Sequence, residues 1–549
     1  MKKHIFPFFL LITLCLNAQT GSKPGFRVPF DFPIYLSGNF GELRANHFHA
    51  GLDFKTQGAT GKRVLALGNG YISHIRVTHG SGYVLEVVYD DGYTAIYRHD
   101  QGFVGEIARR VEELQYKNES WEVDIKPEPH EYPVRAGQHL SWSGNMGYSF
   151  GPHLHLELRE TKTGDYIDPL PFFKSEIKDT RAPEVLGFML FPQIGEGVVN
   201  GDSTPKVFQT TKKDTIKAWG IIGAGIRAYD YMNETTNRYG VYLVMLIVDG
   251  EEVFQSTVDR FSSSEDRMIN SWTEGQYMKS FIDPGNTLRM LKAKSSSRGL
   301  IKIDQEKDYH FLYILKDVYG NTTRFNFVVK GERAPIPPPF PKDKYYFAWN
   351  RINYLYEPGM ALIVPQKMLY KDVYLNYNAQ IDSGAVSYVH QLNDEKIPLH
   401  GYSELRIGVR NMPVADTTKY YIARITDKGK LASVGGTYEK GYIKARIREL
   451  ATYTVAVDTV PPKIEPIGKN NWAKNRQIIY KIDEEETGIK SYRGTIDGQY
   501  ALFYLRIIND RLVCNLNPNR IKKGITHEVE VTVVDNCGNQ TTVKDKFVW

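Results

Sequence analysis

The most regular hydrophobic pattern in the chain runs from residue 153 to residue 158. Three leucines alternate there with three polar residues, in the order His153, Leu154, His155, Leu156, Glu157 and Leu158. An alternation with a period of two is typical of a half-buried β-strand. The leucines are therefore expected to face a core, and the two histidines and the glutamate to share the opposite face. At about 3.3 Å of rise per residue the histidines stand roughly 7 Å apart along the strand, so that one imidazole can bind a metal while the other reaches a substrate.

Shorter apolar runs precede this strand and are punctuated by glycine. They cover residues 64–67, 70–77, 83–89 and 93–99, and Asp90-Asp91-Gly92 supplies a hairpin turn between the last two. Residues 134–138 then lead into the alternating strand. Strand-length runs joined by such turns predict a compact antiparallel β-domain.

The second half of the chain repeats two short motifs. The stretch that starts at Asp179 (Asp-Thr-Arg-Ala-Pro) parallels the one at Asp458 (Asp-Thr-Val-Pro-Pro), and each opens a segment. Asp-x-x-Gly-Asn occurs at 317–321 and again at 535–539, near the end of a segment. Strands at 241–248 and 529–534 with adjacent Asp-Gly turns predict β-sandwiches, and the Asp-x-x-Gly-Asn endings resemble bacterial immunoglobulin-like (Ig-like) domains.

A chain of 549 residues is too long for one core. The predicted divisions are a signal peptide (1–18), a first β-domain (19–175), an Ig-like β-sandwich (176–332), a proline-rich linker (333–343), a β-rich domain (344–457) and a C-terminal Ig-like domain (458–549). Segment 344–457 has no firm family at this stage, and binding of cell wall or a partner stands beside a plain spacer role. Cys514 and Cys537 either form a local disulfide or are two independent buried thiols.

The N-terminus predicts export. Basic residues at Lys2 and Lys3 precede an apolar run to Leu16, and a small residue, Ala18, offers a cleavage position. Cys15 is a poor candidate for lipid anchoring because bulky Leu14 precedes it. No other segment predicts a membrane span. Because of this predicted export signal, the expected location is the periplasm or cell envelope. The net charge of +6 is small for this length, and no nucleic-acid motif accompanies it.

Candidate chemistry is concentrated in the first domain. Ten of the fourteen histidines precede Phe173. His49 and Asp53 lie four residues apart around a glycine, which can turn a nitrogen and an oxygen toward one point. Zinc accepts such mixed ligands and takes three from protein in catalytic sites. His49, Asp53 and one histidine of the 153/155 pair make up such a set.

Three blocks of this region match a known family. They are His49-Ala50-Gly51-Leu52-Asp53, Tyr97-Arg98-His99 and residues 144–157, which read GNMGYSFGPHLHLE. In this order they resemble the lysostaphin-like (LytM-type) zinc endopeptidases that cut peptidoglycan peptides. The resemblance covers about residues 21–171. It implies an antiparallel β-sheet peptidase domain of the LytM type, so the fold expected for the whole chain is mainly β, with three β-sandwich domains after the peptidase.

The resemblance also implies residue roles. His49, Asp53 and His155 would be the ligands of Zn²⁺, and His99 and His153 the unliganded catalytic histidines. Which of these two removes a proton and which stabilises the oxyanion stays open. Glu157 either orients a ligand or is a solvated carboxylate, and the other histidines of the region need no role.

The function implied is an exported metalloendopeptidase that hydrolyses the peptide cross-links of peptidoglycan, with peptide stems as its partner. The scissile bond, a D,D cross-link or a glycine bridge, is open. One alternative is a wall-binding scaffold or activator of other hydrolases without activity of its own. Another is a metalloendopeptidase that acts on an exported protein. The set of five residues is complete, which favours an enzyme over a scaffold.

The chain departs from the family between His99 and Val134, where the connection is longer than usual. Apolar residues at helical spacing predict an amphipathic helix over 104–116, followed by a loop through His130. The insertion is either a wall of the substrate groove, which tunes or occludes it, or a surface decoration.

Overall fold

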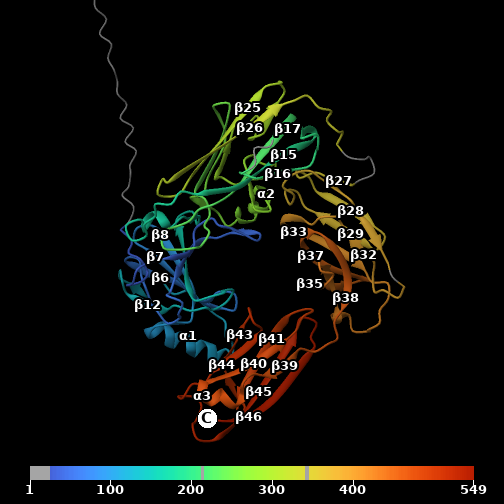
Figure 1. Cartoon of the computed structure of the whole chain (residues 1–549). Coiled ribbons are helices and arrows are strands. Elements are labelled where there is room, and N and C mark those ends of the chain that lie inside the picture. Colours follow the sequence, from blue (N-terminus) through green and yellow to red (C-terminus); the bar gives the residue numbers. More distant parts are fainter. Residues whose placement is uncertain (1–24, 212–214, 340–344, 382) are drawn as a thin grey trace, which may run out of the picture.

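The computed structural model describes residues 25–211, 215–339, 345–381 and 383–549 (Figure 1). Strands dominate it, which confirms the mainly β class. The predicted signal peptide and part of the predicted linker lie outside the described residues. Within the described ranges, no helix is both long and apolar enough to cross a membrane. The predicted domain limits are kept here as names for four parts, the first (25–175), second (176–332), third (345–457) and fourth (458–549) domains.

The first domain is built on one antiparallel sheet, whose neighbouring strands β4, β13 and β8 carry the three family-like blocks of the sequence. In spatial order its strands are β1 (Leu36–Gly38), β4 (Gly51–Lys55), β13 (His153–Glu160), β8 (Tyr93–Asp100), β7 (Gly82–Tyr89), β6 (Gly70–Thr78) and β10 (Val123–Ile125), with β11 (Pro133–Val134) on β6 and β14 (Tyr166–Ile167) on β13. The alternating stretch is the central strand β13. Its leucines are fully buried in the core, as the pattern predicts.

Smaller elements complete the first domain. They are a three-stranded sheet of β5 (Arg63–Leu65), β12 (His139–Trp142) and β9 (Gly102–Phe103), the pair β2 (Leu43–Arg44) and β3 (His47–Phe48), helix α1 (Gly105–Lys117) and the 3-10 turn η1 (Leu170–Phe172). The predicted hairpin is β7–β8, and Gly92 in its turn has a φ of +84°. Glycine adopts that left-handed conformation without the steric cost that a Cβ brings.

The second domain contains the longest strands, which turn back on each other as β15 and β17. One sheet holds β16 (Lys206–Phe208), β15 (Glu184–Val199), β17 (Ile216–Tyr229), β26 (Thr322–Gly331), β25 (Asp308–Lys316), β18 (Leu243–Val248), β19 (Glu251–Thr257) and β23 (Leu291–Ala293), with β21 (Thr273–Glu274), β22 (Tyr277–Lys279) and β24 (Ile301–Ile303) beside it. Strand β20 (Arg260–Phe261), turn η2 (Asp266–Met268) and the short helix α2 (Ile269–Trp272) face the first domain.

The third domain is a sandwich of two five-stranded sheets. One holds β28 (Asn353–Glu357), β29 (Met360–Val364), β33 (Ile397–Gly408), β37 (Tyr442–Leu450) and β36 (Thr437–Glu439), and the other β31 (Asn378–Gln380), β32 (Val389–Gln391), β38 (Thr452–Val457), β34 (Tyr420–Ile425) and β35 (Leu431–Gly435). The pair β27 (Tyr345–Phe347) and β30 (Val373–Leu375) and the turn η3 (Thr417–Lys419) lie alongside.

The fourth domain is a smaller sandwich of two four-stranded sheets. One sheet holds β39 (Lys463–Pro466), β40 (Gln477–Asp483), β44 (Arg511–Asn515) and β43 (Phe503–Arg506). The other holds β42 (Gln499–Ala501), β41 (Ile489–Ile496), β45 (Thr526–Asp535) and β46 (Gln540–Val548). The domain also contains the 3-10 turn η4 (Lys469–Asn471) and the short helix α3 (Trp472–Asn475). Cys514 is buried in its core, whereas Cys537 packs with Tyr421 and Ala423 of the third domain. Both cysteines are free, so the structure contains two separate buried thiols and no local disulfide.

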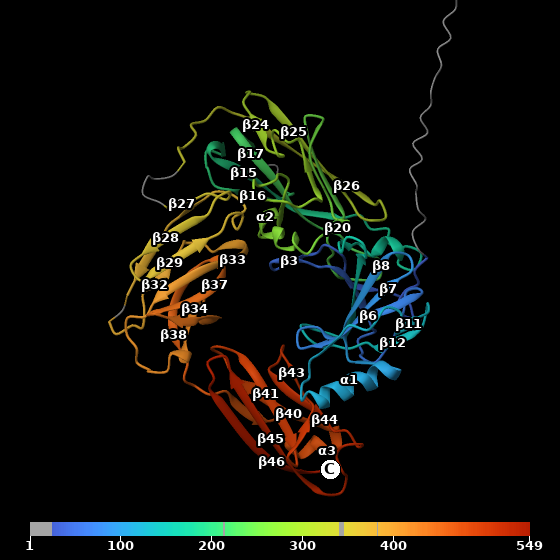
Figure 2. The same ribbon diagram turned by 180° about the vertical axis from the view of Figure 1, so that it is seen from behind.

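The four domains form a closed ring, which both views show (Figures 1 and 2). Strand β14 of the first domain pairs with β20 of the second. The second and third domains meet where Arg267 donates to the carbonyl of Leu399, and the third and fourth where Lys419 donates to Asn539. The ring is completed between the fourth domain and the first, on helix α1.

Helix α1 therefore has two partners. Its inner face buries Ile107 and Val111 in the core of the first domain. Its outer face meets the fourth domain: the Arg520 guanidinium lies 3.5 Å from the centroid of the Tyr116 ring and also donates to Glu112. The helix begins at Gly105 and ends at Lys117, close to the predicted limits.

Candidate metal centre

Two neighbouring strands bring the candidate ligands together. β4 and β13 pair antiparallel, and Asp53 lies directly opposite His155 in their register. Directly opposite residues on an antiparallel pair project from the same face of the sheet. His49 lies just before β4 and reaches the same face from its end. The sheet register therefore builds the site from residues that are about a hundred positions apart in sequence.

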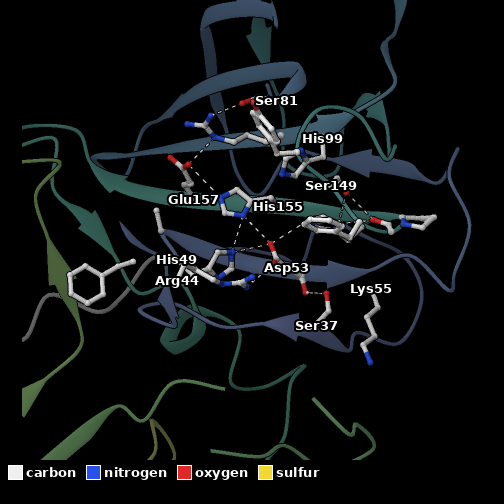
Figure 3. Close-up of a pocket in the computed structure, with 18 of the residues that line it drawn as sticks. Ser37, Arg44, His49, Asp53, Lys55, Ser81, His99, Ser149, His155 and Glu157 are labelled. Atoms are coloured by element: carbon white, nitrogen blue, oxygen red, sulfur yellow. Dashed lines mark hydrogen bonds and ion pairs between the residues drawn. The ribbon is translucent and has the colours of Figure 1, made fainter. Parts of the chain in front are cut away.

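The three side chains converge on one point (Figure 3). His49 Nε2 lies 3.0 Å from Asp53 Oδ1 and 3.0 Å from His155 Nδ1, and His155 Nδ1 lies 2.9 Å from Asp53 Oδ1. Two imidazole nitrogens and one carboxylate oxygen are a typical zinc donor set. All three residues are buried or nearly so.

Hydrogen bonds outside this group orient both imidazoles. His49 donates from Nδ1 to the carbonyl of Asn39 at 2.6 Å, which leaves Nε2 facing the group. His155 Nε2 faces Glu157 Oε1 at 3.4 Å, which leaves Nδ1 facing the group. Glu157 is only 4 % exposed and is paired with Arg98 at 2.8 Å. Such outer partners fix the tautomer and the ring direction of metal-binding histidines.

The electrostatics keep the carboxylate ionised. Burial alone would raise the pKa of Asp53, but His49 and the hydrogen bond from His155 outweigh it and hold that pKa well below its usual range. Burial likewise opposes the charged form of His155, yet the hydrogen bonds to Asp53 and Glu157 raise its pKa to about 9. Asp53 is thus an ionised acceptor beside a protonated His155, and metal binding would displace that proton.

The site leaves no room for a side chain at its floor. A Cβ on Gly38 would lie 2.7 Å from Asp53 Oδ2 and 3.3 Å from His49 Cε1. Glycine is therefore required at position 38 if Asp53 and His49 are to keep their places. Together with the donor atoms and the fixed ring directions, this tight cradle shows that the residues present fit a bound metal ion of the zinc type.

Two further histidines stand beside the group. The rings of His99 and His153 have centroids 5.0 Å apart, and His153 Nε2 lies 3.5 Å from Asp53 Oδ1. Each donates from Nδ1 to a main-chain carbonyl at 2.8 Å, His99 to Met146 and His153 to Gly151. In the neutral imidazole each Nε2 is therefore left without a hydrogen.

The surroundings of both imidazoles favour the neutral form. Burial, with a smaller contribution from the neighbouring His155 and His153 rings, lowers the pKa of His99 to about 3. Burial also lowers the pKa of His153. His99 has a φ of +68°, a left-handed conformation that costs energy outside glycine and that packing must maintain. This conformation at the end of β8 aims the ring at the group.

A groove of about 1240 Å³ runs over the site. Two aromatic side chains stand on its rim with little cover, Tyr148 at 69 % and Phe150 at 93 % exposure. Phe261 and Asp266 of the second domain also line it. The second domain thus forms part of the wall, and Asp266 accepts a hydrogen bond from the Phe48 amide at 2.7 Å.

Short stretches of the chain are similar to known peptidases. Lysostaphin of Staphylococcus simulans is 46% identical to the chain over 44 residues, which is 8% of this chain and 9% of that protein. Glycyl-glycine endopeptidase ALE-1 of Staphylococcus capitis is also 46% identical over 44 residues, 8% of this chain and 12% of the relative. The likeness is to lysostaphin-type peptidases. The matched stretch spans only about a tenth of the length of these relatives.

Two further comparisons concern larger parts of the chain. The solved catalytic domain of lysostaphin from Staphylococcus simulans is 25% identical, covers 26% of this chain and 92% of that chain, and gives a TM-score of 0.19. A family model described as Zu5-like domain matches residues 344–458. That match gives a family likeness to the segment for which the sequence alone suggested none.

All five predicted site residues come together, and their roles stay predictions. The other histidines of the domain have different partners. His74 pairs with Asp124, His79 contacts Tyr492, and His139 packs on Trp142. His47 lines the groove but bonds to the carbonyl of Ala45.

The sequence leaves three contributions to the site undetermined. Asn39 and the wall residues of the second domain carry no motif that would reveal them. Glu157, left open between two interpretations, is buried against His155 and is not solvated. The sequence predicts that the insertion either lines the groove or decorates the surface. In the structure α1 contributes no lining residue and instead contacts the fourth domain.

Proposed function

We propose that the protein is an exported, zinc-dependent endopeptidase that hydrolyses peptide cross-links of peptidoglycan in the periplasm or cell envelope. The observation that carries the proposal is the convergence of His49, Asp53 and His155 on one point, with His99 and His153 beside them at the floor of one groove. The similarity to lysostaphin and to ALE-1 supports the substrate class.

His49, Asp53 and His155 would hold the zinc ion. Zinc, when bound, supplies a Lewis acid that polarises the scissile carbonyl and makes a water more acidic. The chain contributes the fixed directions of the three donor atoms. Asn39 and Glu157 maintain them through hydrogen bonds that do not depend on substrate.

His99 and His153 would move the proton. Each presents an unprotonated Nε2 at neutral pH, because its Nδ1 hydrogen is committed to a main-chain carbonyl. Such a nitrogen can accept the proton of an attacking water and pass it to the leaving amine. Once protonated, the same ring can donate a hydrogen bond to the oxyanion. Both rings have the same resting hydrogen-bond pattern, so the division of these tasks between them stays open.

The groove suits an extended peptide. Its volume exceeds the roughly 300–1000 Å³ common for small-molecule pockets. Exposed Tyr148 and Phe150 give a peptide apolar surface along the groove. The three following β-domains would position the peptidase on the wall.

The alternatives make different predictions. A scaffold without activity, or an activator of other hydrolases, needs none of the proton-accepting histidines, and here all are in place. An endopeptidase for an exported protein would cleave that protein and leave the wall intact.

The decisive experiment is muropeptide release from purified sacculi by the protein without residues 1–18. A chelator-treated sample and the His155→Ala variant run beside it. Metal-dependent loss of cross-linked dimers is expected, and the structures of the products identify the scissile bond. Absence of release by zinc-loaded protein would contradict the proposed substrate.

Two variants separate binding from turnover. His155→Ala is expected to lose both zinc and activity, because it removes a donor atom. His99→Ala is expected to retain zinc and to lose a factor of about 10² to 10⁴ in kcat, the usual contribution of a general acid–base group. Zinc content by mass spectrometry and activity are measured on the same samples. Full activity in either variant would contradict the proposed roles of these residues.

A further inference from the structure

A second group of carboxylates lies in the second domain, at the end that meets the first. Asp179 lies five residues before β15, Asp230 directly follows β17, and Asp317 directly follows β25. The strands thus bring three acids from distant parts of the chain to one end of the sheet. One oxygen of each lies within 4.8 Å of the others.

These acids are buried. The exposed fractions of Asp179, Asp230 and Asp317 are 7 %, 3 % and 3 %. Among the described residues, no ion pair joins any of the three to a lysine, arginine or histidine. Charges of one sign in an apolar interior are costly unless a counter-charge is supplied. Burial and the two neighbouring acids raise the pKa of Asp230 to about 8.

Two carboxylate oxygens of this group lack partners. Asp179 accepts amide hydrogens from Arg181 and Asn233 on Oδ1, but its Oδ2 is buried without a hydrogen bond. Asp230 Oδ1 is likewise buried and unpartnered. Asp317 is held by the amides of Gly320 and Asn321, which fix its carboxylate. The side chain of Asn321 also donates to Asp317 Oδ2. Asp317 is thus fully held by the chain, whereas Asp179 and Asp230 each keep one buried oxygen without a hydrogen bond.

We infer that Asp179, Asp230 and Asp317 bind one calcium ion, at a site separate from the proposed zinc centre. The donors are all oxygens, which excludes the nitrogen- and sulfur-preferring metals. A buried group with several carboxylates favours Ca²⁺ over Mg²⁺, because Mg²⁺ retains much of its water and seldom occupies a cage made by protein alone. The ion would balance the negative charge of the three carboxylates, so that none of them has to be protonated.

The fourth domain contains a corresponding group of acids that can be compared with this one. Asp458, Glu484 and Asp535 occupy corresponding places around β39, β40 and β45. Asn539 donates to Asp535 Oδ2, as Asn321 donates to Asp317 Oδ2 in the second domain. The groups differ at the first acid: Thr487 donates to Asp458 Oδ2, whereas Asp179 Oδ2 is buried without a hydrogen bond. The two groups therefore correspond in position, but buried carboxylate oxygens without a hydrogen bond occur only in the group of the second domain.

The ion would act on the junction between the first two domains. Asn321, next to the group, donates to the carbonyl of Asp179, and Tyr319 donates to that of Ile177. Lys174 of the first domain donates to the carbonyl of Val318 at 2.5 Å. A cation that ties Asp179 to Asp317 thus fastens the segment leaving the first domain to the edge of the second.

Calorimetric and thermal titration with CaCl₂ tests this on the full chain without residues 1–18. Wild type, stripped of metal, is expected to bind one Ca²⁺ with a rise in Tm of several degrees, and MgCl₂ at the same concentration to have a much smaller effect. Asp230→Asn is expected to weaken Ca²⁺ binding at least tenfold and to abolish the rise in Tm. Its Tm in chelator should equal or exceed that of wild type, because it removes one of three like charges.

Two matched variants complete the test. Asp458→Asn, the corresponding change in the fourth domain, is expected to leave the response to Ca²⁺ intact. His155→Ala is expected to respond as wild type does, which separates this site from the proposed zinc centre. No response of wild type to millimolar Ca²⁺, or a response lost in Asp458→Asn and kept in Asp230→Asn, would overturn the inference.

Discussion

The indole of Trp121 packs against the phenol ring of Tyr504, with centroids 4.9 Å apart and planes inclined by 31°. This contact joins the first domain to the fourth. Tyr504 and Val513 are members of the core cluster of the first domain, so the junction is partly a shared hydrophobic core. Ion pairs surround it, among them Glu119 with Arg493, which lie 374 residues apart in sequence.

Charge reversal at this junction is expected to open the ring. The double change Arg493→Glu and Arg520→Glu places two acids opposite Glu119 and Glu112. Each exposed pair contributes at most about 1 kcal/mol, but like charges also repel. Small-angle scattering should show a larger radius of gyration, and restoring complementarity with Glu112→Arg and Glu119→Arg should reverse it.

The matched control carries the same change in net charge away from the junction. Lys522→Glu with Lys523→Glu alters two exposed cations of the fourth domain and should leave the radius unchanged. Equal expansion in both double variants would show that net charge, and not the contact, sets the shape.

Glu157→Gln is expected to weaken zinc binding by about 10- to 100-fold, the usual effect of losing an outer partner of a ligand histidine. The amide keeps the size of the side chain but loses the charge that faces His155 and Arg98. Competition with a chromophoric chelator measures the affinity. The control is Glu160→Gln at the end of the same strand, which loses an ion pair with Arg260 but does not contact His155. Equal affinities in the two variants would speak against the orienting role.

Gly38→Ala is expected to abolish metal binding while the fold persists. The added methyl group meets Asp53 Oδ2 and His49 Cε1, and neither ligand can move away without leaving the group. Gly102→Ala, where the Cβ has nothing within 4 Å, serves as the control. Circular dichroism and zinc stoichiometry together decide the outcome. A zinc-loaded Gly38→Ala protein would show that the cradle is looser than its contacts indicate.

Stability is expected to fall as the pH drops from about 6.5 to about 4, in part through His390. This side chain is fully buried, and burial lowers its pKa to about 4. In that window the unfolded chain takes up a proton that the folded chain does not, so acid favours unfolding. Thermal midpoints of wild type and His390→Gln across this range should converge at low pH. A difference between the two midpoints that stays constant across the range would contradict the role of His390.

Much of the first domain could be predicted because its signals are local. The alternation at 153–158 specifies which side chains face the core, and the Asp-Asp-Gly turn specifies a hairpin. Periodicity tells which face Glu157 occupies but not what covers that face, and its cover comes from Arg98 on a neighbouring strand. The role of α1 was also beyond reach, because the helix pattern describes its inner face and the partner of its outer face lies in the last domain.

The contact between Trp121 and Tyr504 affects how firmly the first and fourth domains associate. Both partners belong to one chain, so they meet at an effective concentration set by the intervening domains and not by the amount of protein in solution. An interface too weak to hold two separate proteins at cellular dilution can therefore stay closed here. A single backbone cleavage elsewhere in the ring would leave its fragments attached to one another through the remaining junctions.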